Sequence, residues 1–457
     1  MLKKSLSVFT LAALLVMNQG CNTTKEATKS SKPLRIIVLD PGHFHADLLQ
    51  KTSYEQVDST VHVYAPEGAE VKAYLSKVDQ YNTRSESPTN WNEKIYTGPD
   101  YLKKMLAEKP GNVVVLAGNN QKKTNYIKQS VDAGLNVLAD KPMAIDAAGF
   151  ELLKEAFASA EKSNVLLYDI MTERYEITNA LQKELAKQSA IFGELQKGTP
   201  EQPAISKESV HHFSKIVSGS PLVRPAWFFD TKQQGEGIVD VNTHLVDLIQ
   251  WAAFPEVVLS SADVTLTSAR RWTTDLTPSQ FKLVTKQDTY PTYLSSSVKD
   301  SILSVYANGE INYTLKGIHA QVKVLWNFQA PQGAGDTHYS VMRGSKANLI
   351  IRQGQEQNYK PMLYIEAVGT DAGYAQAMEA DFKTVEAMYP GIELKKDTNG
   401  WQVVIPAKYD NGHEAHFAQV ARKYMDYLKA GKLPDWEVPN MITKYYTTTQ
   451  ALQMANQ

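Results

Sequence analysis

Short runs of branched apolar residues alternate with helical patterns through the first third of the chain, and this alternation is what most constrains the fold. The first run, at 34–39, ends at Asp40, and a helical pattern follows it. Buried parallel strands have such continuous apolar runs, and a helix between two of them makes a crossover connection. We therefore predict an α/β domain with a doubly wound parallel sheet over 33–170, with strands at 34–39, 61–64, 112–117, 136–139 and 164–168.

Polar residues gather where these predicted strands end. In a doubly wound sheet, ligands bind beyond the carboxyl ends of the strands, where helix N-termini favour anions. The residues at these ends are therefore the first candidates for a site: Asp40, Gly42, His43, His45, Glu67, Asn119, Asn120, Asp140 and Lys141.

The pattern changes after about residue 170, and we expect a second domain over 171–457. Helical turns near 175–187 give way to alternating runs rich in tyrosine and valine, which are typical of antiparallel strands. Asn308-Gly309 stands between two such runs and predicts a tight hairpin turn. The expected domain is therefore α+β with a large, mostly antiparallel open sheet, including strands at 301–306, 310–315, 320–328 and 348–351.

One helix of the second domain is predicted to carry three ionisable residues on one face. It is expected over 235–251 and is entered through two glycines. Asp240, His244 and Asp247 follow one another at intervals of four and three residues, so a helix places them on the same side. Ordinary solvated helix faces also carry such pairs, so the spacing alone leaves that alternative open.

The N-terminus has the pattern of an export signal with a lipid attachment site. Two lysines precede an apolar run that is too short to span a bilayer as a helix, and the single cysteine of the chain, Cys21, follows. This resembles a bacterial lipoprotein processing site, although Asn18 stands where such sites usually have leucine. We predict a signal peptide over 1–20, a lipidated Cys21 with a polar tether over 21–32, and an anchored protein at the bacterial cell envelope that faces the periplasm or the exterior. A plain secretory signal is the alternative.

Composition excludes several classes of protein. The chain has 457 residues, of which 43% are hydrophobic and 21% charged, so it can bury real cores. Its formal net charge of −1 offers no basic field for a nucleic-acid backbone. Because Cys21 is the only cysteine, we expect no disulfide and no thiolate zinc site, and we predict no metal site.

Four segments of the chain resemble one known family. They are the first strand with its turn, Asp140-Lys141-Pro142 after a strand, the helix with Asp240 and His244, and the segment 343–349. From about residue 34 to the C-terminus the chain resembles the glucose–fructose oxidoreductase/inositol dehydrogenase (Gfo/Idh/MocA) family, in an exported lipoprotein branch. The resemblance implies a Rossmann domain that binds a nicotinamide dinucleotide and a second domain whose open sheet supports the substrate site. It also implies oxidation or reduction of hydroxyl carbons of sugars and cyclitols.

The glycine-rich turn of a dinucleotide site is only partly present. Its glycines serve the tight turn, the approach of the pyrophosphate and the helix contact, and only Gly42 stands in place. His43 and His45 could hydrogen-bond the phosphates or crowd them. Glu67 is the expected partner of the ribose hydroxyls, so we predict NAD, with NADP left open. The predicted cofactor-binding residues are Asp40, Gly42, His43, His45, Glu67, Asn119, Asn120 and Lys141.

Hydride transfer from a carbinol carbon needs a base for the hydroxyl proton and a positive group beside the developing alkoxide. Lys141 is the predicted positive group and a second candidate for the base, and His244 is the better candidate for the base near pH 7. We expect Asp240 to orient the imidazole of His244. The predicted substrate-binding residues, placed in part by the resemblance, are Arg174, Tyr175, Trp227 and Asp247.

Other readings of the same residues stay open. His43 and His45 form a His-x-His at a strand end, which suits a metallohydrolase completed by His244 or by the pair His413 and His416. A sugar-binding lipoprotein without catalysis is a third reading, and a redox-assisted glycosidase is a variant within the family. His211-His212 and His413 with His416 are otherwise interpreted as surface histidines. The expected partner is a small sugar or glycoside, with a homo-oligomer through the open sheet.

Overall fold

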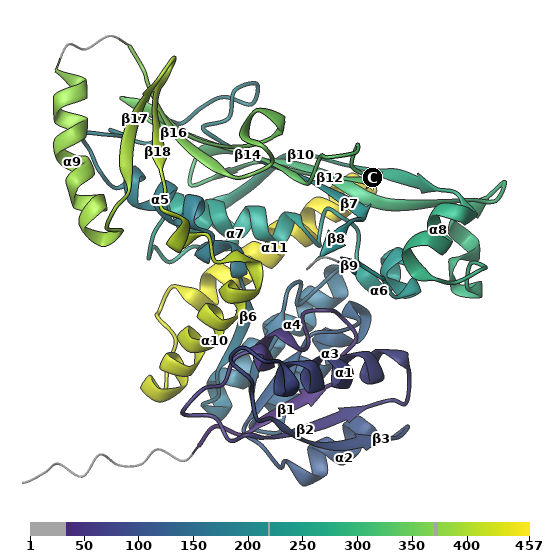
Figure 1. Cartoon of the computed structure of the whole chain (residues 1–457). Helices are drawn as coiled ribbons and strands as arrows, with labels where there is room; N and C mark the ends of the chain where they lie inside the picture. Colours follow the sequence, from purple (N-terminus) through teal and green to yellow (C-terminus); the bar gives the residue numbers. More distant parts are fainter. Residues whose placement is uncertain (1–32, 218–219, 370–372) are drawn as a thin grey trace, which may run out of the picture. The chain divides into compact units, whose positions relative to one another are not determined.

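A six-stranded parallel sheet forms the first part of the fold (Figure 1). Its strands are β1 (Ile36–Leu39), β2 (Thr60–Ala65), β3 (Asn92–Thr97), β4 (Val113–Leu116), β5 (Asn136–Asp140) and β6 (Leu167–Ile170). They lie in the order β3-β2-β1-β4-β5-β6, and every neighbouring pair is parallel. The predicted doubly wound sheet is confirmed, and its direction of winding changes between β1 and β4.

The computed structural model describes residues 33–217, 220–369 and 373–457, and Pro33–Gln457 forms one compact unit. The predicted signal peptide, Cys21 and the tether lie outside the described residues. Of the helices in the described ranges, none combines the length and the apolar character needed to cross a membrane.

The connection from β1 to β2 differs from the helix that the sequence predicted. Turns and a short 3-10 helix, η1 (Leu48–Lys51), stand there instead. The indole of Trp91 donates to the carbonyl of Gln50 at 2.6 Å, and the Gln50 amide donates to Glu93 at 2.8 Å. These contacts to the edge of β3 hold the backbone of this segment outside a helical ladder. The helices of this part are α1 (Ala69–Thr83), α2 (Tyr101–Glu108), α3 (Asn120–Asp132) and α4 (Ala147–Ser163).

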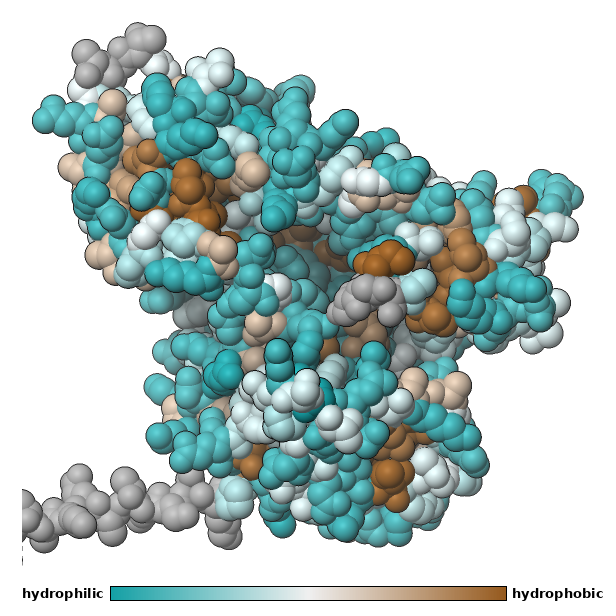
Figure 2. Space-filling model, in the orientation of Figure 1, coloured by the Kyte–Doolittle hydropathy of each residue, from teal (hydrophilic) through white to brown (hydrophobic). Residues whose placement is uncertain are grey.

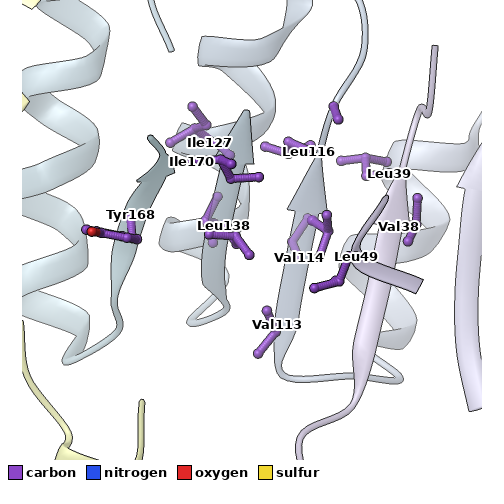
Figure 3. Packing of buried hydrophobic residues seen from close by; sticks show 14 of the residues in the cluster. Val38, Leu39, Leu49, Val113, Val114, Leu116, Ile127, Leu138, Tyr168 and Ile170 are labelled. Atoms are coloured by element: carbon purple, nitrogen blue, oxygen red, sulfur yellow. The ribbon is translucent and has the colours of Figure 1, made fainter. Parts of the chain in front are cut away.

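The core of the parallel sheet is built from the branched residues that marked its strands in the sequence. All four residues of β1 and of β4 are buried, which is the pattern of strands covered on both faces. Figure 3 shows side chains of β4, β5 and β6 beside Ile127 of α3 and Leu49 of η1. This packing fixes the strand ends that carry the candidate site.

A 10-stranded sheet forms the second part of the fold, as predicted, and is mostly antiparallel. Its long strands are β7 (Ile205–Ser214), β10 (Val264–Leu276), β12 (Ile302–Leu315), β13 (Ile318–Gln329), β14 (Thr337–Arg343), β15 (Ala347–Gln353), β16 (Met362–Ala367), β17 (Glu393–Asp397) and β18 (Gly400–Val404). The order is β10-β12-β13-β7-β14-β15-β16-β18-β17, with the short β11 (Val298–Lys299) beside β12. Only the β13/β7 pair among these described strands is parallel.

The hairpin predicted at Asn308-Gly309 is wrong, because both residues lie within β12. The side chain of Asn308 bonds to neighbouring strands, and a Cβ at Gly309 would stand 2.6 Å from Cβ of Ile238. Glycine is therefore needed for the close approach of another segment rather than for a turn. The chain reverses instead at Lys316-Gly317, where φ is 51° and 77°.

Helices cover one face of the large sheet and also join it to the first part. They are α5 (Ile177–Ala186), α6 (Thr231–Gln234), α7 (Asn242–Ala253), α8 (Pro278–Thr285), α9 (Tyr374–Met388), α10 (Gly412–Ala430) and α11 (Glu437–Ala455). The hydroxyl of Tyr424 in α10 donates to carbonyls of Val137 and Leu166 in the parallel domain. The chain therefore returns to the first core at its C-terminal end, where Figure 1 shows α10 and α11 in yellow.

Candidate active site

A cleft of about 980 Å³ opens where the ends of β1 and β5 face β7 and α7. Figure 2 shows the surface hollowed at this level. Lys141, Asp240 and His244, the three predicted catalytic residues, all line it, although they come from segments about a hundred residues apart. The structure thus brings the two most specific motifs of the sequence together.

Lys141 and Asp240 form an ion pair on the wall of this cleft. Lys141 follows β5, and its Nζ lies 2.7 Å from Oδ1 of Asp240. The amide of Gln234 donates to Oδ2 of Asp240 at 3.0 Å. Burial would raise the pKa of Asp240, but the ammonium of Lys141 lowers it below its usual value. Asp240 therefore stays ionised and fixes the direction of the lysine.

Lys123 supports the turn that carries Lys141 and was not among the predicted site residues. Its side chain is buried and donates to the carbonyls of Asp140 at 2.9 Å and Pro142 at 3.3 Å, and to the side chain of Asn120 at 2.5 Å. Burial lowers the pKa of Lys123 to about 8. The sequence left the role of Lys123 open, because a lysine on the mainly polar α3 is equally expected at the surface.

His244 is positioned differently from the prediction. Helix α7 begins at Asn242, so Asp240 lies in the turn before it, and both carboxylate oxygens are already bonded to Lys141 and Gln234. Asp240 therefore does not orient the imidazole, and the predicted Asp240–His244 pair is corrected. In the described part of the chain, Nδ1 of His244 has no hydrogen-bond partner. Burial, and then the charge of Lys141, lower the pKa of His244 to about 3.

A second cluster of ionisable side chains on the same wall connects the end of β1, through His43 and His45, to the end of β5, through Asp140. Nδ1 of His45 lies 3.0 Å from Oδ2 of Asp140, and Nδ1 of His43 lies 3.3 Å from the same oxygen. Nε2 of His45 faces Nε2 of His413 at 3.1 Å. Both His43 and His45 thus turn into the large cleft, so the prediction that they contact the phosphates of a dinucleotide is corrected.

A smaller pocket of about 180 Å³ lies beyond the ends of β1, β2 and β4. Asp40, Gly42, Glu67 and Asn119 line it, as predicted for the cofactor, whereas Asn120 and Lys141 line the large cleft. A Cβ on Gly42 would stand 3.7 Å from each of Glu70, Gly118 and Trp227, so its absence leaves a cradle between them. This cradle, with Glu67 at its rim, fits the ribose and phosphate portion of a dinucleotide.

The phosphate side of this pocket departs from the usual arrangement. The amides of Gly42 and His43 both donate to the carbonyl of Ala117, at 3.1 and 3.2 Å, and no α-helix starts after β1. The cation of the pocket is Lys122, whose Nζ lies 3.3 Å from Asp40. Lys122, which the sequence analysis did not single out, is therefore the side chain of this pocket that could meet a phosphate.

Two of the predicted substrate residues are held elsewhere, and their assignment is corrected. The guanidinium of Arg174 donates to both oxygens of Asp247 at 2.7 Å and to Glu437 at 3.0 and 3.1 Å. Asp247 also accepts from Lys444 at 2.9 Å, and its side chain is 2% exposed. Neither Arg174 nor Asp247 lines the cleft, because the neutralising partners of each lie in the core between α7 and α11.

Tyr175 and Trp227 also fall outside the large cleft. Tyr175 borders a separate cavity of about 690 Å³ beside Trp436, and Trp227 packs against the cradle at Gly42. Their predicted role as a substrate wall is therefore corrected as well. Glu173, two residues before Tyr175, lines the cleft instead.

The far wall of the cleft includes two histidines that the sequence analysis assigned to the surface, His211 and His212. His212 Nδ1 lies 2.8 Å from Asp336 Oδ1, and Nζ of Lys215 lies 2.9 Å from Oδ2 of the same aspartate. The ring of His211 stacks on Trp326 at 5.0 Å. A His-His pair on an alternating strand does not reveal that β7 ends at a cleft, so the interpretation as surface histidines was wrong.

Comparison with known proteins agrees with the geometry. A family profile described as "Oxidoreductase family, NAD-binding Rossmann fold" matches residues 34–168, and one described as "Putative oxidoreductase C terminal domain" matches 181–456. No curated protein matches the chain at a significant level.

Solved structures extend the similarity over nearly the whole chain. A "putative oxidoreductase" from Parabacteroides merdae is 58% identical, with a TM-score of 0.92 over 93% of this chain and 98% of that one. The 3-ketoreductase KijD10 from Actinomadura kijaniata, in complex with NADP, is 14% identical, with a TM-score of 0.55 over 92% and 98%. A levoglucosan dehydrogenase in complex with NADH is 11% identical, with a TM-score of 0.59 over 93% and 97%.

The last two structures share the fold, whereas the matched profiles and the first structure assign the family. The chain belongs to the Gfo/Idh/MocA family and is an NAD(P)-dependent oxidoreductase with an NAD-binding Rossmann domain.

Proposed function

We propose that this protein reversibly oxidises a secondary hydroxyl of a sugar or glycoside with NAD(H), at ring carbon 3. The observation that carries the proposal is the Lys141–Asp240 pair, which stands on the cleft wall between the cofactor pocket and the second domain. The sugar-acting structural neighbours, a 3-ketoreductase and a levoglucosan dehydrogenase, support this substrate class. Glu67 at the pocket rim favours NAD over NADP, because a 2′-phosphate would meet a carboxylate.

The side chains of the cleft have separate tasks. A bound nicotinamide supplies the hydride acceptor or donor. Lys141 donates a hydrogen bond to the reacting oxygen, and this bond strengthens as negative charge develops there. His244, whose side chain lines the cleft, accepts the hydroxyl proton, since burial and the charge of Lys141 keep its imidazole neutral at working pH.

The size of the cleft and the His212–Asp336 pair on its far wall also favour a related reaction, the redox-assisted cleavage of a glycoside. His212, Asp336 and Trp326 stand beyond the reaction centre, where a second sugar unit of a glycoside would lie. A redox-assisted glycosidase begins with the same oxidation, which acidifies the neighbouring C–H and allows elimination of the aglycone before the alcohol is restored. Both versions share the first half-reaction.

A panel of glycosides tests both versions with protein of verified NAD content. Formation of a keto-sugar with equimolar NADH identifies a dehydrogenase, and release of the aglycone without net NADH identifies the glycosidase. If neither product forms with any glycoside, the proposed substrate class is wrong.

We further propose that the protein acts at the cell envelope through a lipid on Cys21, following an export signal over 1–20. Free nicotinamide dinucleotides are scarce outside the cytoplasm, so the cofactor should be held tightly and recycled in place. Replacing Cys21 with serine should release the protein from membranes after a salt wash. Retention of Cys21→Ser in the membrane fraction would refute the anchor.

A further inference from the structure

Three side chains of the type that bind metals meet at the ends of β1 and β5, two strands that are separated by β4. His43 and His45 follow β1, and Asp140 is the last residue of β5. One ligand atom from each lies within 4.8 Å of the others, and all three residues line the large cleft. We propose that His43, His45 and Asp140 bind one divalent transition-metal ion of the zinc type, in place of the metal-free site that the sequence predicted.

The separations of the ligand atoms suit a metal as well as a hydrogen bond. Oδ2 of Asp140 lies 3.0 Å from Nδ1 of His45 and 3.3 Å from Nδ1 of His43. A tetrahedral zinc ion with bonds of about 2.0–2.1 Å places neighbouring ligands roughly 3.3 Å apart. Both separations are therefore near those of ligands that share one ion.

The hydrogen-bond pattern around His43 distinguishes the two explanations. The backbone N–H of His45 donates to Nδ1 of His43 at 3.4 Å, so this nitrogen presents a lone pair. The same nitrogen faces a carboxylate oxygen of Asp140 at 3.3 Å, and in this tautomer two acceptors repel each other at that distance. A cation between them would take the lone pair, which the long contact to the His45 amide uses only weakly, and would convert the repulsion into two bonds.

The other nitrogen of His45 begins a chain that a metal would complete. With Nδ1 bound to the ion, Nε2 carries the proton and donates to Nε2 of His413 at 3.1 Å. The proton of His413 is then on Nδ1, which faces Oε1 of Glu173 at 3.7 Å. Metal-bound histidines are commonly oriented by such a second partner. Without a metal, Nδ1 of His45 carries the proton and donates to Asp140, so Nε2 of His45 accepts from Nε2 of His413. Nδ1 of His413 is then an acceptor that faces the carboxylate of Glu173.

Three protein ligands leave one position of a tetrahedral ion open. None of the three residues lines the small cofactor pocket, so dinucleotide and metal do not compete for space there. The open position faces the cleft that also contains Lys141, and oxygen atoms of a bound ligand could fill it. Two imidazoles with one carboxylate favour zinc or a neighbouring transition metal over magnesium or calcium.

Titration of the full-length protein with Co²⁺ and Zn²⁺, after removal of metals with a chelator, tests the site. We expect one equivalent of Co²⁺ to give visible d–d absorption and an equivalent of Zn²⁺ to displace it. His45→Gln and Asp140→Asn should each weaken binding by roughly 100-fold, within the range of affinity that metal ligation supplies. His211→Gln, which changes a cleft histidine outside the three ligands, should leave the affinity within about threefold.

If a ligand variant fails to fold, the site is still tested by a second measurement, the unfolding temperature of the wild-type protein with and without Zn²⁺. Zn²⁺ should raise the unfolding temperature of the wild-type protein and of His211→Gln, but not that of the folded ligand variant, His43→Gln. Wild-type protein that takes up less than one equivalent, or ligand variants that bind as well as it does, would overturn the proposal. NAD binding by metal-free protein is measured separately, so failure of the metal site and failure of the proposed function are distinguishable.

Discussion

Two of the buried charge clusters in the described part of this protein differ in what surrounds them. Lys141 and Asp240 pair on the wall of a cleft, beside a histidine whose Nδ1 has no partner among the described residues. Lys444 pairs with Asp169 at 2.7 Å and with Asp247 at 2.9 Å, and its side chain has no exposed surface. The Lys141 cluster therefore borders the cleft, whereas the charged groups of the Lys444 cluster are enclosed in the core and contact each other.

This difference separates activity from stability. A buried ion pair that is fully enclosed contributes mainly through the penalty of leaving one charge unpaired when it is broken. A pair beside a cleft can direct a charge at a ligand, because its donors are not all used within the protein. Substitutions in the two clusters should consequently affect different measurements.

The largest effect is expected for Lys141→Met on hydride transfer. Removing the ammonium should slow the step by roughly 10²–10⁴, the usual contribution of a positioned acid or base. Dinucleotide binding should stay close to wild type. The free energy of unfolding should fall by less than for a fully enclosed pair, because Asp240 keeps the amide of Gln234 and borders the cleft, where water can solvate it. Single-turnover kinetics with NAD-loaded protein measure the change.

A matched control and a double variant sharpen this prediction. Lys286→Met changes another lysine of the cleft and should leave the rate unchanged. The double variant Lys141→Met with His244→Ala should lose much less than the sum of the two single losses in free energy, because both residues act on one transition state. A wild-type rate in both single variants would place the chemistry elsewhere in the cleft.

Lys444→Met should act on stability instead. It leaves Asp247 with Arg174 but removes the cation that pairs with Asp169 within the core. Breaking such a pair costs about 3–5 kcal/mol. Urea denaturation should show this loss in the free energy of unfolding, while folded protein retains hydride transfer. A large loss of rate with unchanged stability would reverse the assignment of the two clusters.

The pH dependence of stability should follow from histidines that are held neutral. Burial lowers the pKa of His338 to about 3, and His244 is lowered to about 3 as well. The unfolded chain takes up these protons near pH 6.5, whereas the folded protein does not, so stability falls as pH decreases from about 6.5 towards 3. His338→Gln should reduce the slope by about 1.4 kcal/mol per pH unit within that window.

Denaturation at several pH values measures this slope. His319→Gln is a suitable control, since it changes a histidine of β13 in the same sheet. An unchanged slope in His338→Gln would mean that this side chain takes up its proton in the folded state.

Local patterns predicted the elements of the fold more completely than they predicted the contacts of the site. The strand ends at Asp40, Glu67, Asn119 and Asp140 were visible because each follows a short apolar run, and parallel strands bring such ends to one edge. The family resemblance placed Lys141, Asp240 and His244 in one active site, but Asp240 was expected to orient His244, and its pairing with Lys141 was not predicted. The pairing itself depends on how the two domains pack.

The wrong assignments share a physical cause, which is that a side chain's partner lies far away in sequence. Arg174 pairs with residues 73 and 263 positions further on, so its own neighbourhood gives no sign that its charge is neutralised. Helix α10 brings His413 to His45 in the same way. At Gly309 the missing information was the approach of Ile238, without which Asn-Gly is a typical turn.

A smaller effect is expected at the cofactor pocket for Lys122→Gln. Because the amides of Gly42 and His43 are used by Ala117, the lysine is the cation of the pocket, and its loss should weaken NAD binding by roughly tenfold, or about 1.4 kcal/mol. The exposed Lys128, which pairs with Asp132 on the same helix, offers a control as Lys128→Gln. Equal affinities in all three proteins, measured by fluorescence titration, would show that the phosphates are bound by other groups.

The smallest effect is expected for the choice between NAD and NADP. The side chain of Glu67 is 78% exposed at the pocket rim, so its repulsion of a 2′-phosphate is screened by water and salt and is worth only about 1 kcal/mol. Glu67→Ser should therefore shift the ratio of the two dissociation constants only several-fold towards NADP, and less at high salt. Glu70 lines the same pocket nearer to Gly42, and Glu70→Ser should leave this ratio unchanged if Glu67 faces the ribose. A shift in Glu70→Ser alone would assign the ribose contact to Glu70, and no shift in either variant would mean that the rim carboxylates do not discriminate between the two cofactors.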